Sequence, residues 1–384
     1  MSLFLLSFFL VYGSMHVYAL LKARSALAPG TGTTLALLLL LAVLLFAPIA
    51  TRLLSGRGYE EAARISAYIG YLWMGFLFFL TCLNLSVDLL RLPLRAMGGG
   101  GIAANAAALL AGRSAFLCIA GLAVALSGYA IVEASRIEVV RLRIATNRLP
   151  ASVPSLRIAQ ITDLHLGLIH RAGMAKEVAR IVALERPDLF VSTGDLLDGQ
   201  LDGVEETAEI LRGIPARRGK FAVLGNHEYF AGIERAIAFT GRSGLTVLRD
   251  NAIVVDNAVR LAGVDDPVGE RFGRTGGLSE SALLGNRPDG LFTVLLKHRP
   301  VLDPATGEIF DLQLSGHTHH GQIFPFRLLT RLFFPLLAGN HSVPGGGILH
   351  VSRGTGTWGP PMRFLAPPEI TVVDIVRSLP AGSE

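Results

Sequence analysis

The chain has 384 residues, enough for two or more folding units, and its formal net charge is +5 at pH 7. No run of Lys and Arg resembles a nucleic-acid-binding stripe, so the composition argues against a nucleic-acid partner. The two cysteines, Cys82 and Cys118, both lie in apolar segments, which argues against a disulfide framework or a cysteine-rich zinc cluster. Apolar residues crowd the first third of the chain, and charged residues occur mainly after residue 135.

Four apolar stretches occur in the first third, at 3–21, 33–50, 65–90 and 114–133. Each is near the ~20 residues that a helix needs to cross a bilayer. The first stretch lacks the basic region and the persuasive cleavage site of a signal peptide. We therefore expect residues 1–135 to form a transmembrane region of about four helices. The Gly98–Gly101 run is expected to connect the third and fourth helices flexibly.

A charged passage with alternating apolar residues, Arg136–Arg148, follows the last apolar stretch. It fits either an edge strand or a short tether. Pro150 and Pro154 then mark the start of a soluble domain. We expect a linker at 136–154 and a catalytic domain at 155–378.

Strand-like and helix-like segments alternate from Leu156 onward, in the order β-α-β-α-β-α. The expected strands are Leu156–Ile161, Leu189–Ser192 and Phe221–Leu224, and the expected helices are Met174–Leu184, Val204–Arg212 and Ile233–Thr240. This order predicts a largely parallel sheet with covering helices. Seven further strand-like runs follow, at 245–248, 253–255, 259–264, 293–296, 312–315, 349–352 and 370–373. A second, mixed sheet facing the first would bury them.

Metal-ligand residue types follow five of the expected strands. The motifs are Asp163-Leu-His165, Gly194-Asp195-Leu-Leu-Asp198, Gly225-Asn226-His227-Glu228, Lys297-His298 and Gly316-His317-Thr-His319-His320. Residues at i and i+2 of an extended segment point to the same side, which places Asp163 and His165 together. Ligands gather at the carboxyl ends of strands in open α/β sheets. One such motif would be weak evidence, but five in this order form a specific signal.

The order of these motifs resembles the calcineurin-like metallophosphoesterase family over residues 155–375. The resemblance implies a four-layer α/β/β/α sandwich after the transmembrane region. The segments 316–322, 351–363 and 367–370 look like a membrane-associated bacterial subgroup. Trp358 and His320 depart from that pattern, since smaller residues are expected there, and these departures concern the fit of the substrate.

The resemblance implies a dinuclear metal centre. One metal would be held by Asp163, His165 and His319, and the other by Asn226, His298 and His317. Asp195 would bridge both metals with its carboxylate. Two divalent ions neutralise the anionic phosphoryl group and generate a hydroxide at neutral pH. Oxygen and imidazole ligands without thiolate suit manganese, iron or zinc.

His227 has a different implied role. Its neighbour Asn226 faces the metal, so His227 is free to act as the general acid that protonates the leaving alkoxide. Asp198 is expected to accept a hydrogen bond behind the ligands, and Glu228 to orient His227.

Turn and core chemistry offers a simpler explanation for each residue alone. Asp163 would be a turn former, Asn226 a left-handed turn residue and His298 a core histidine. Ordinary turns do not explain why histidine recurs after four strands, so we favour the metal centre. His170, His341 and His350 lie outside the pattern and are expected to be surface or core residues.

An apolar passage at 323–337 contains Arg327 and Arg331 one turn apart and is interrupted by proline. It is too short to span a bilayer. The passage fits a buried loop of the domain or an amphipathic lid that dips into the lipid interface beside the metals.

These features predict a membrane-anchored, metal-dependent phosphoester or diphosphate hydrolase. A lipid substrate, as in a UDP-2,3-diacylglucosamine diphosphatase-like activity, is the most concrete version. One alternative is a tethered phosphodiesterase or phosphatase that acts on soluble substrates. Another is a non-catalytic membrane sensor or scaffold with structural metals, against which the intact His227 argues.

The arginines around the four stretches favour a catalytic domain on the cytoplasmic side of a bacterial inner membrane. That side would carry Arg52, Arg57, Arg64, Arg136, Arg141, Arg143 and Arg148. The other side would carry Lys22, Arg24, Arg91, Arg95 and Arg113. Lys22 and Arg24 argue for the opposite orientation, because they follow the first helix. The sequence leaves the oligomeric state open.

Overall fold

The computed structural model describes residues 2–96, 101–199, 205–275, 277–285, 290–303, 306 and 309–378. The chain divides into two compact units. The first contains Met1–Val132 with Gly359–Met362, and the second contains Glu133–Trp358 with Arg363–Glu384. The glycine connection expected at 98–101 lies outside the described residues, apart from Gly101.

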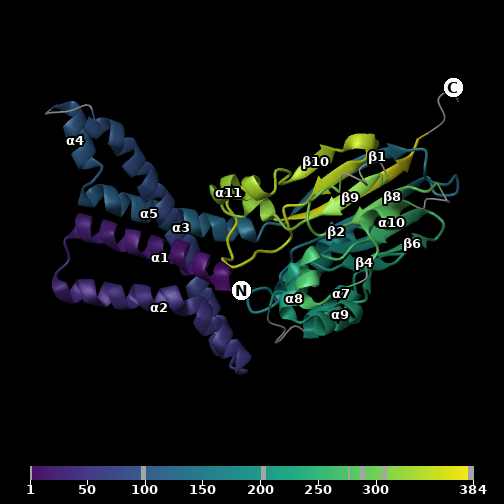
Figure 1. Cartoon of the computed structure of the whole chain (residues 1–384), viewed down its shortest axis with the longest axis horizontal. Coiled ribbons are helices and arrows are strands. Elements are labelled where there is room, and N and C mark those ends of the chain that lie inside the picture. The colour runs from purple at the N-terminus through teal and green to yellow at the C-terminus, as the bar shows by residue number, and fades with distance from the viewer. Residues whose placement is uncertain are drawn as a thin grey trace. The chain divides into compact units, whose positions relative to one another are not determined.

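Helices form the first unit (Figure 1). They are α1 (Ser2–Leu27), α2 (Thr31–Gly56), α3 (Glu60–Ala96), α4 (Ile102–Leu109) and α5 (Arg113–Ala134). Among the described residues, α1, α2, α3 and α5 are long and apolar enough to cross a membrane. Large apolar side chains such as Leu10 and Leu39 are exposed on them, as a lipid-facing surface requires. The four predicted stretches therefore form helices that are able to cross a membrane, whereas the short, alanine-rich α4 was not predicted.

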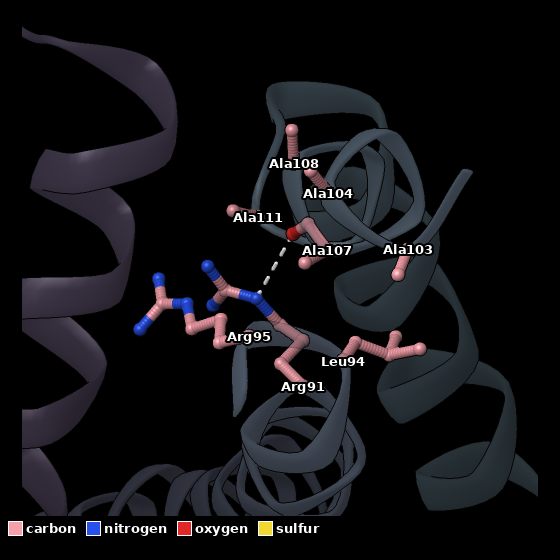
Figure 2. A pocket seen from close by; sticks show the side chains of 8 residues that line it. All are labelled: Arg91, Leu94, Arg95, Ala103, Ala104, Ala107, Ala108 and Ala111. Carbon is pink, nitrogen blue, oxygen red and sulfur yellow. Dashed lines mark hydrogen bonds between the residues drawn. The ribbon is translucent and has the colours of Figure 1, made fainter. Parts of the chain in front are cut away.

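Charged side chains cluster near the end of α3. The Asp88 carboxylate accepts hydrogen bonds from Lys22 Nζ at 2.5 Å, Tyr18 Oη at 2.7 Å and Arg91 Nη1 at 3.1 Å. A pocket of about 410 Å³ lies next to it, lined by Arg91, Arg95, Leu94 and alanines of α4 and of the turn that follows it. Figure 2 shows that Arg91 also donates from Nε to the Ala107 carbonyl oxygen, at 3.1 Å. These pairs compensate the charge of Asp88 near a helix end, where an unpaired carboxylate in lipid would be costly.

Two six-stranded sheets form the second unit. The first sheet has the order β1-β12-β2-β3-β4-β5. Its strands are β1 (Glu138–Thr146), β12 (Glu369–Arg377), β2 (Ser155–Ile161), β3 (Leu189–Thr193), β4 (Lys220–Val223) and β5 (Thr246–Val247). Strands β2 to β5 are parallel, as the alternating order predicts, and β12 runs antiparallel to β2.

The passage expected as a linker contains β1, an edge strand that pairs in parallel with β12 from Glu138↔Glu369 to Thr146↔Arg377. Of the two alternatives, the edge strand is therefore the correct one. Its alternating apolar residues explain the pairing, because Val139 and Leu142 pack against the cores on opposite faces of the sheet.

The second sheet has the order β10-β11-β9-β8-β7-β6. Its strands are β10 (Gly339–Ser342), β11 (Ile348–Val351), β9 (Leu312–Ser315), β8 (Thr293–Leu296), β7 (Val259–Gly263) and β6 (Asn251–Val255). Strands β7, β8, β9 and β11 are parallel, and the two outer strands are antiparallel to their neighbours. The sheet is mixed, as predicted.

Alternation along β2 shows how the layers stack. Leu156 and Ile158 point into the core between the two sheets, and Ala159 and Ile161 point into the core under the helices. The covering helices of the first sheet are α6 (Ala172–Glu185), α7 (Glu205–Arg212) and α9 (Ile233–Arg242). On the second sheet, Leu283 and Leu284 of α10 (Glu280–Gly285) pack against Leu295 and Leu349. The predicted four-layer α/β/β/α sandwich is therefore confirmed.

Candidate metal centre

The predicted ligands follow the carboxyl ends of strands from both sheets. Asp163 and His165 follow β2, Asp195 follows β3, and Asn226 follows β4 at the start of α8 (Asn226–Ala231). From the second sheet, His298 follows β8, and His317 and His319 follow β9. The histidines and aspartates form three overlapping groups whose ligand atoms lie within 4.8 Å of one another. These groups are Asp163, His165 and His319; His165, Asp195 and His227; and Asp195, His298 and His317.

The first group is buried and its nitrogens face each other. His165 Nε2 lies 3.1 Å from His319 Nε2, which in turn lies 3.4 Å from Asp163 Oδ1. The three residues are at most 8% exposed. Two imidazole nitrogens and a carboxylate oxygen therefore converge on one point, an arrangement that suits a cation.

The group of Asp195, His298 and His317 repeats this arrangement, and one of its oxygens also lies near the first group. His298 Nε2 lies 3.1 Å from His317 Nδ1 and 3.2 Å from Asp195 Oδ2. The same Asp195 oxygen lies 3.9 Å from His165 Nε2. One carboxylate oxygen thus faces both groups, as the bridging role predicted for Asp195 would require.

Burial keeps two imidazoles of the site neutral, and the Asp195 carboxylate favours a positive charge beside a third. Burial, together with repulsion by His227, lowers the pKa of His165 to about 3. Burial likewise holds the pKa of His319 well below its usual value, so both rings are neutral, the form that binds metals. Burial also lowers the pKa of His298, but the Asp195 carboxylate outweighs it and raises this pKa to about 10. A positive charge, whether a proton or a metal ion, is therefore stabilised beside Asp195.

Two observations on side chains, one on Asn226 and one on His298, test whether the residues fit a metal ion. Asn226 Oδ1 is buried and has no hydrogen-bond partner among the described residues, although buried oxygens are normally paired. His298 Nδ1 lies 2.9 Å from the carbonyl oxygen of Thr193, to which it can donate, and this leaves Nε2 free as a ligand. The donor set of oxygen and imidazole atoms therefore fits a divalent metal.

The backbone of the site is held in an unusual conformation. Five of the predicted ligands have φ between 48° and 72°, namely Asp163, His165, Asp195, His317 and His319. This left-handed region is sparsely populated by residues other than glycine, and such strain gathers at functional sites. Hydrogen bonds maintain it, since His317 N–H donates to both oxygens of Asp163 at 3.0 Å.

Glycine is required where two of the turns meet. A Cβ on Gly225 would lie 2.2 Å from Asp195 Oδ1, and a Cβ on Gly194 would lie 2.7 Å from the backbone nitrogen of Gly225. The glycines of the Gly-Asp and Gly-Asn motifs therefore allow the two loops to pack closely. The residues that follow these glycines are the predicted ligands.

Glu228 joins the same two loops. Its carboxylate accepts N–H groups of Gly225 at 2.7 Å, Asp195 at 3.0 Å and Leu197 at 3.1 Å. The expectation that Glu228 orients His227 is therefore wrong. Glu228 instead fixes the backbone of the Asp195 loop against the start of α8, a role that its sequence position did not reveal.

Asp198 is the residue that orients His227. His227 Nδ1 lies 3.1 Å from Asp198 Oδ1, and its backbone N–H donates to Asp195 Oδ1 at 2.9 Å. Burial lowers the pKa of His227, but the carboxylates of Asp195 and Asp198 outweigh burial and raise it to about 9. The ring is therefore protonated at neutral pH and lies 4.6 Å, centroid to centroid, from His165. A proton donor stands next to the ligand groups.

Arg363 was not predicted as part of the site. It is fully buried, and its guanidinium lies 3.1 Å from His319 Nδ1 and donates to the His319 carbonyl oxygen at 3.0 Å. In the sequence, Arg363 is marked only by its place at the end of the 351–363 segment. Only the tertiary fold brings the 351–363 segment into contact with His319.

Aromatic side chains border the centre. The rings of Trp358 and Phe230 lie 5.9 and 5.6 Å from that of His227, and Phe334 lies 4.9 Å from His317. Trp358 and Phe230 are about half exposed. Trp358, which is larger than the residue expected at this position, therefore stands beside His227.

Comparison with known proteins agrees with this geometry. Residues 156–321 match the family model described as calcineurin-like phosphoesterase. The chain is 37% identical to an uncharacterized metallophosphoesterase of Aquifex aeolicus, over 66% of this chain and 97% of the relative. It is 33% identical to an uncharacterized metallophosphoesterase of Helicobacter pylori, over 58% of this chain and 60% of the relative.

The name of a third relative describes it as a transmembrane protein. It is a transmembrane protein with metallophosphoesterase domain from Danio rerio, which is 32% identical over 64% of this chain and 59% of the relative. Together with the four membrane-span-capable helices, this relative supports a location in a membrane. The chain belongs to the calcineurin-like phosphoesterase family, which implies phosphoester hydrolysis at a dinuclear metal centre.

Proposed function

We propose that this chain is a membrane-anchored phosphoester hydrolase with two divalent metals bridged by Asp195. The observation that carries the proposal is the single Asp195 oxygen that faces His298 at 3.2 Å and His165 at 3.9 Å. Asp163, His165 and His319 would complete one site. Asn226, His298 and His317 would complete the other.

The bound ions would neutralise the phosphoryl charge and activate a water as the nucleophile. The chain itself supplies the proton for the leaving group. His227, held by Asp198 at 3.1 Å, would donate that proton as the leaving oxygen departs. A site with purely structural metals has no need of this paired, protonated histidine, which argues against the sensor or scaffold alternative. Manganese, iron and zinc all suit the ligand set.

The proposed substrate is a phosphoester or diphosphate attached to a lipid, of which a UDP-2,3-diacylglucosamine-type diphosphate is the most concrete form. Two observations support a lipid. The chain carries four helices able to cross a membrane, and the exposed apolar helix α11 (Phe326–Phe333) lies next to His317 through Phe334. Hydrolysis of soluble phosphoesters alone is the competing outcome.

A substrate panel tests the proposal. We expect the purified full chain, supplied with Mn²⁺, Fe²⁺ or Zn²⁺, to hydrolyse bis-p-nitrophenyl phosphate slowly and lipid diphosphates in vesicles faster. The aromatic and apolar borders of the site give binding energy only to the larger substrate. Measured kcat/KM for soluble esters equal to or above that for every lipid would contradict the lipid substrate. Absence of turnover with every metal would contradict the enzyme itself.

The proposed side of the membrane is the cytoplasm, on the basis of the arginines that flank the helices. A fusion of alkaline phosphatase after residue 384 is expected to be inactive, and a fluorescent protein fused there is expected to fluoresce. High phosphatase activity would place the domain outside. That result would exclude a nucleotide-linked lipid as the substrate, since nucleotide-linked precursors are cytoplasmic.

A further inference from the structure

The helix α11 exposes an apolar face that the second unit does not bury. Leu328, Leu329, Leu332 and Phe333 are 61, 49, 76 and 74% exposed, and no residue of α11 is buried. Of the two alternatives for the passage at 323–337, the buried loop is therefore wrong for α11. At 100° per residue these four side chains share one side of the helix, whereas Arg327 and Arg331 lie on the other. Large apolar groups gathered in this way indicate an interaction surface.

Contacts with the rest of the second unit hold the chain on both sides of α11. Before α11, Phe324 N–H donates to the Phe364 carbonyl oxygen at 3.1 Å, and a Cβ on Gly321 would lie 2.3 Å from Arg327 Cα. After α11, Thr318 Oγ1 donates to the carbonyl oxygen of the buried Leu337 at 2.6 Å. The apolar face is thus presented by a fixed helix.

The segment that carries α11 has basic but no acidic residues. Residues 321–350 contain no Asp or Glu, and Arg327 and Arg331 both lie on the helix. The Arg327 guanidinium lies 4.8 Å from the centre of the Phe324 ring, and Arg331 is exposed. A helix with leucines and phenylalanines on one side and arginines beside them is typical of binding to an anionic lipid surface.

We propose that α11 inserts its apolar face into the interfacial layer of a bilayer that contains anionic phospholipids. The four membrane-span-capable helices of the same chain make the bilayer the surface most available to it. Charge complementarity favours this occupant over a second copy of the chain, because two copies of α11 would bring four arginines together. The proposal concerns contact with lipid and does not depend on hydrolysis.

Fluorescence of the full chain in nanodiscs tests the insertion. In a Cys82→Ala, Cys118→Ala background, Leu332→Cys places a nitrobenzoxadiazole label on the apolar face. Leu184→Cys on α6 is the matched control, since Leu184 is 68% exposed on the same unit. We expect the Leu332→Cys label to be quenched by nitroxide-labelled phospholipids and shielded from aqueous iodide, and the Leu184→Cys label to show the reverse.

Quenching of both labels by iodide alone would overturn the proposal. Shielding from iodide without quenching by lipid nitroxides would also overturn it, and would indicate that protein covers α11. Replacing anionic phosphatidylglycerol with phosphatidylcholine, or introducing Arg327→Gln with Arg331→Gln, is expected to lower the ratio of inserted to free helix about fivefold per arginine. An unchanged ratio would contradict the role of the arginines.

A functional control separates insertion from damage to the metal centre. Leu332→Ser with Phe333→Ser should leave hydrolysis of bis-p-nitrophenyl phosphate and metal content unchanged, because both side chains point to solvent. Loss of lipid quenching together with intact hydrolysis is the result we expect. Lipid quenching that persists in this variant would contradict insertion through the apolar face.

Discussion

Asp195→Asn is expected to lose most of the bound metal and nearly all hydrolysis of bis-p-nitrophenyl phosphate. Asp195 Oδ2 faces His298 at 3.2 Å and His165 at 3.9 Å, so the substitution removes a negative charge from both proposed metal sites at once. The new amide group would point an N–H donor or a weaker, neutral oxygen at each site. Metal content by mass spectrometry of the purified chain measures the effect directly.

Asp374→Asn is a matched control for this variant. Asp374 lies on β12, where it pairs with Arg157 at 2.6 Å and belongs to none of the ligand groups. We expect it to keep its metals and its turnover. An Asp195→Asn protein with two metals and full activity would contradict the bridged centre.

His227→Ala is expected to keep its metals and to lower kcat by ~10²–10⁴-fold on esters with poor leaving groups. The His227 ring can donate a proton, because Asp198 and Asp195 outweigh its burial and raise its pKa to about 9. Removing the ring removes the proton donor, whereas the proposed ligands remain. Steady-state kinetics with metal-saturated protein measures the loss.

The leaving group separates this role from a structural one. A p-nitrophenolate departs without protonation, so the loss of kcat should shrink for aryl esters and reach its maximum for alkyl esters. Asp198→Asn should show the same trend with a smaller loss, since the ring persists without its partner. An equal loss across all leaving groups would rule out general acid catalysis by His227.

Much of the site could be predicted because its information is local. Each motif, such as Asp163-Leu-His165 or Gly316-His317-Thr-His319, places its ligands in the turn after a single strand, and parallel strands end at one edge. The structure brings these turns together from two sheets. The convergence of these aspartates and histidines was therefore predictable without knowledge of the tertiary contacts, whereas their role as ligands stays a prediction.

The parts that could not be predicted depend on contacts between distant segments. Arg363 reaches His319 from 44 residues away, and Glu228 binds backbone groups of the loop at 195–197. Neither contact leaves a periodicity or a motif in the sequence. The 323–337 passage was ambiguous for another reason, because an apolar composition fits a buried loop and an exposed lipid-binding helix equally well. Only the observed exposure of Leu332 and Phe333 distinguishes them.

The most direct test of the central claim is electron paramagnetic resonance of the full chain during titration with Mn²⁺. Two ions bridged by Asp195 would lie about 3.5–4 Å apart, close enough for their spins to couple. We predict a spin-coupled spectrum that reaches its maximum at two equivalents of Mn²⁺ and disappears in Asp195→Asn. A spectrum of uncoupled ions at two equivalents, or saturation at a single equivalent, would contradict the dinuclear centre.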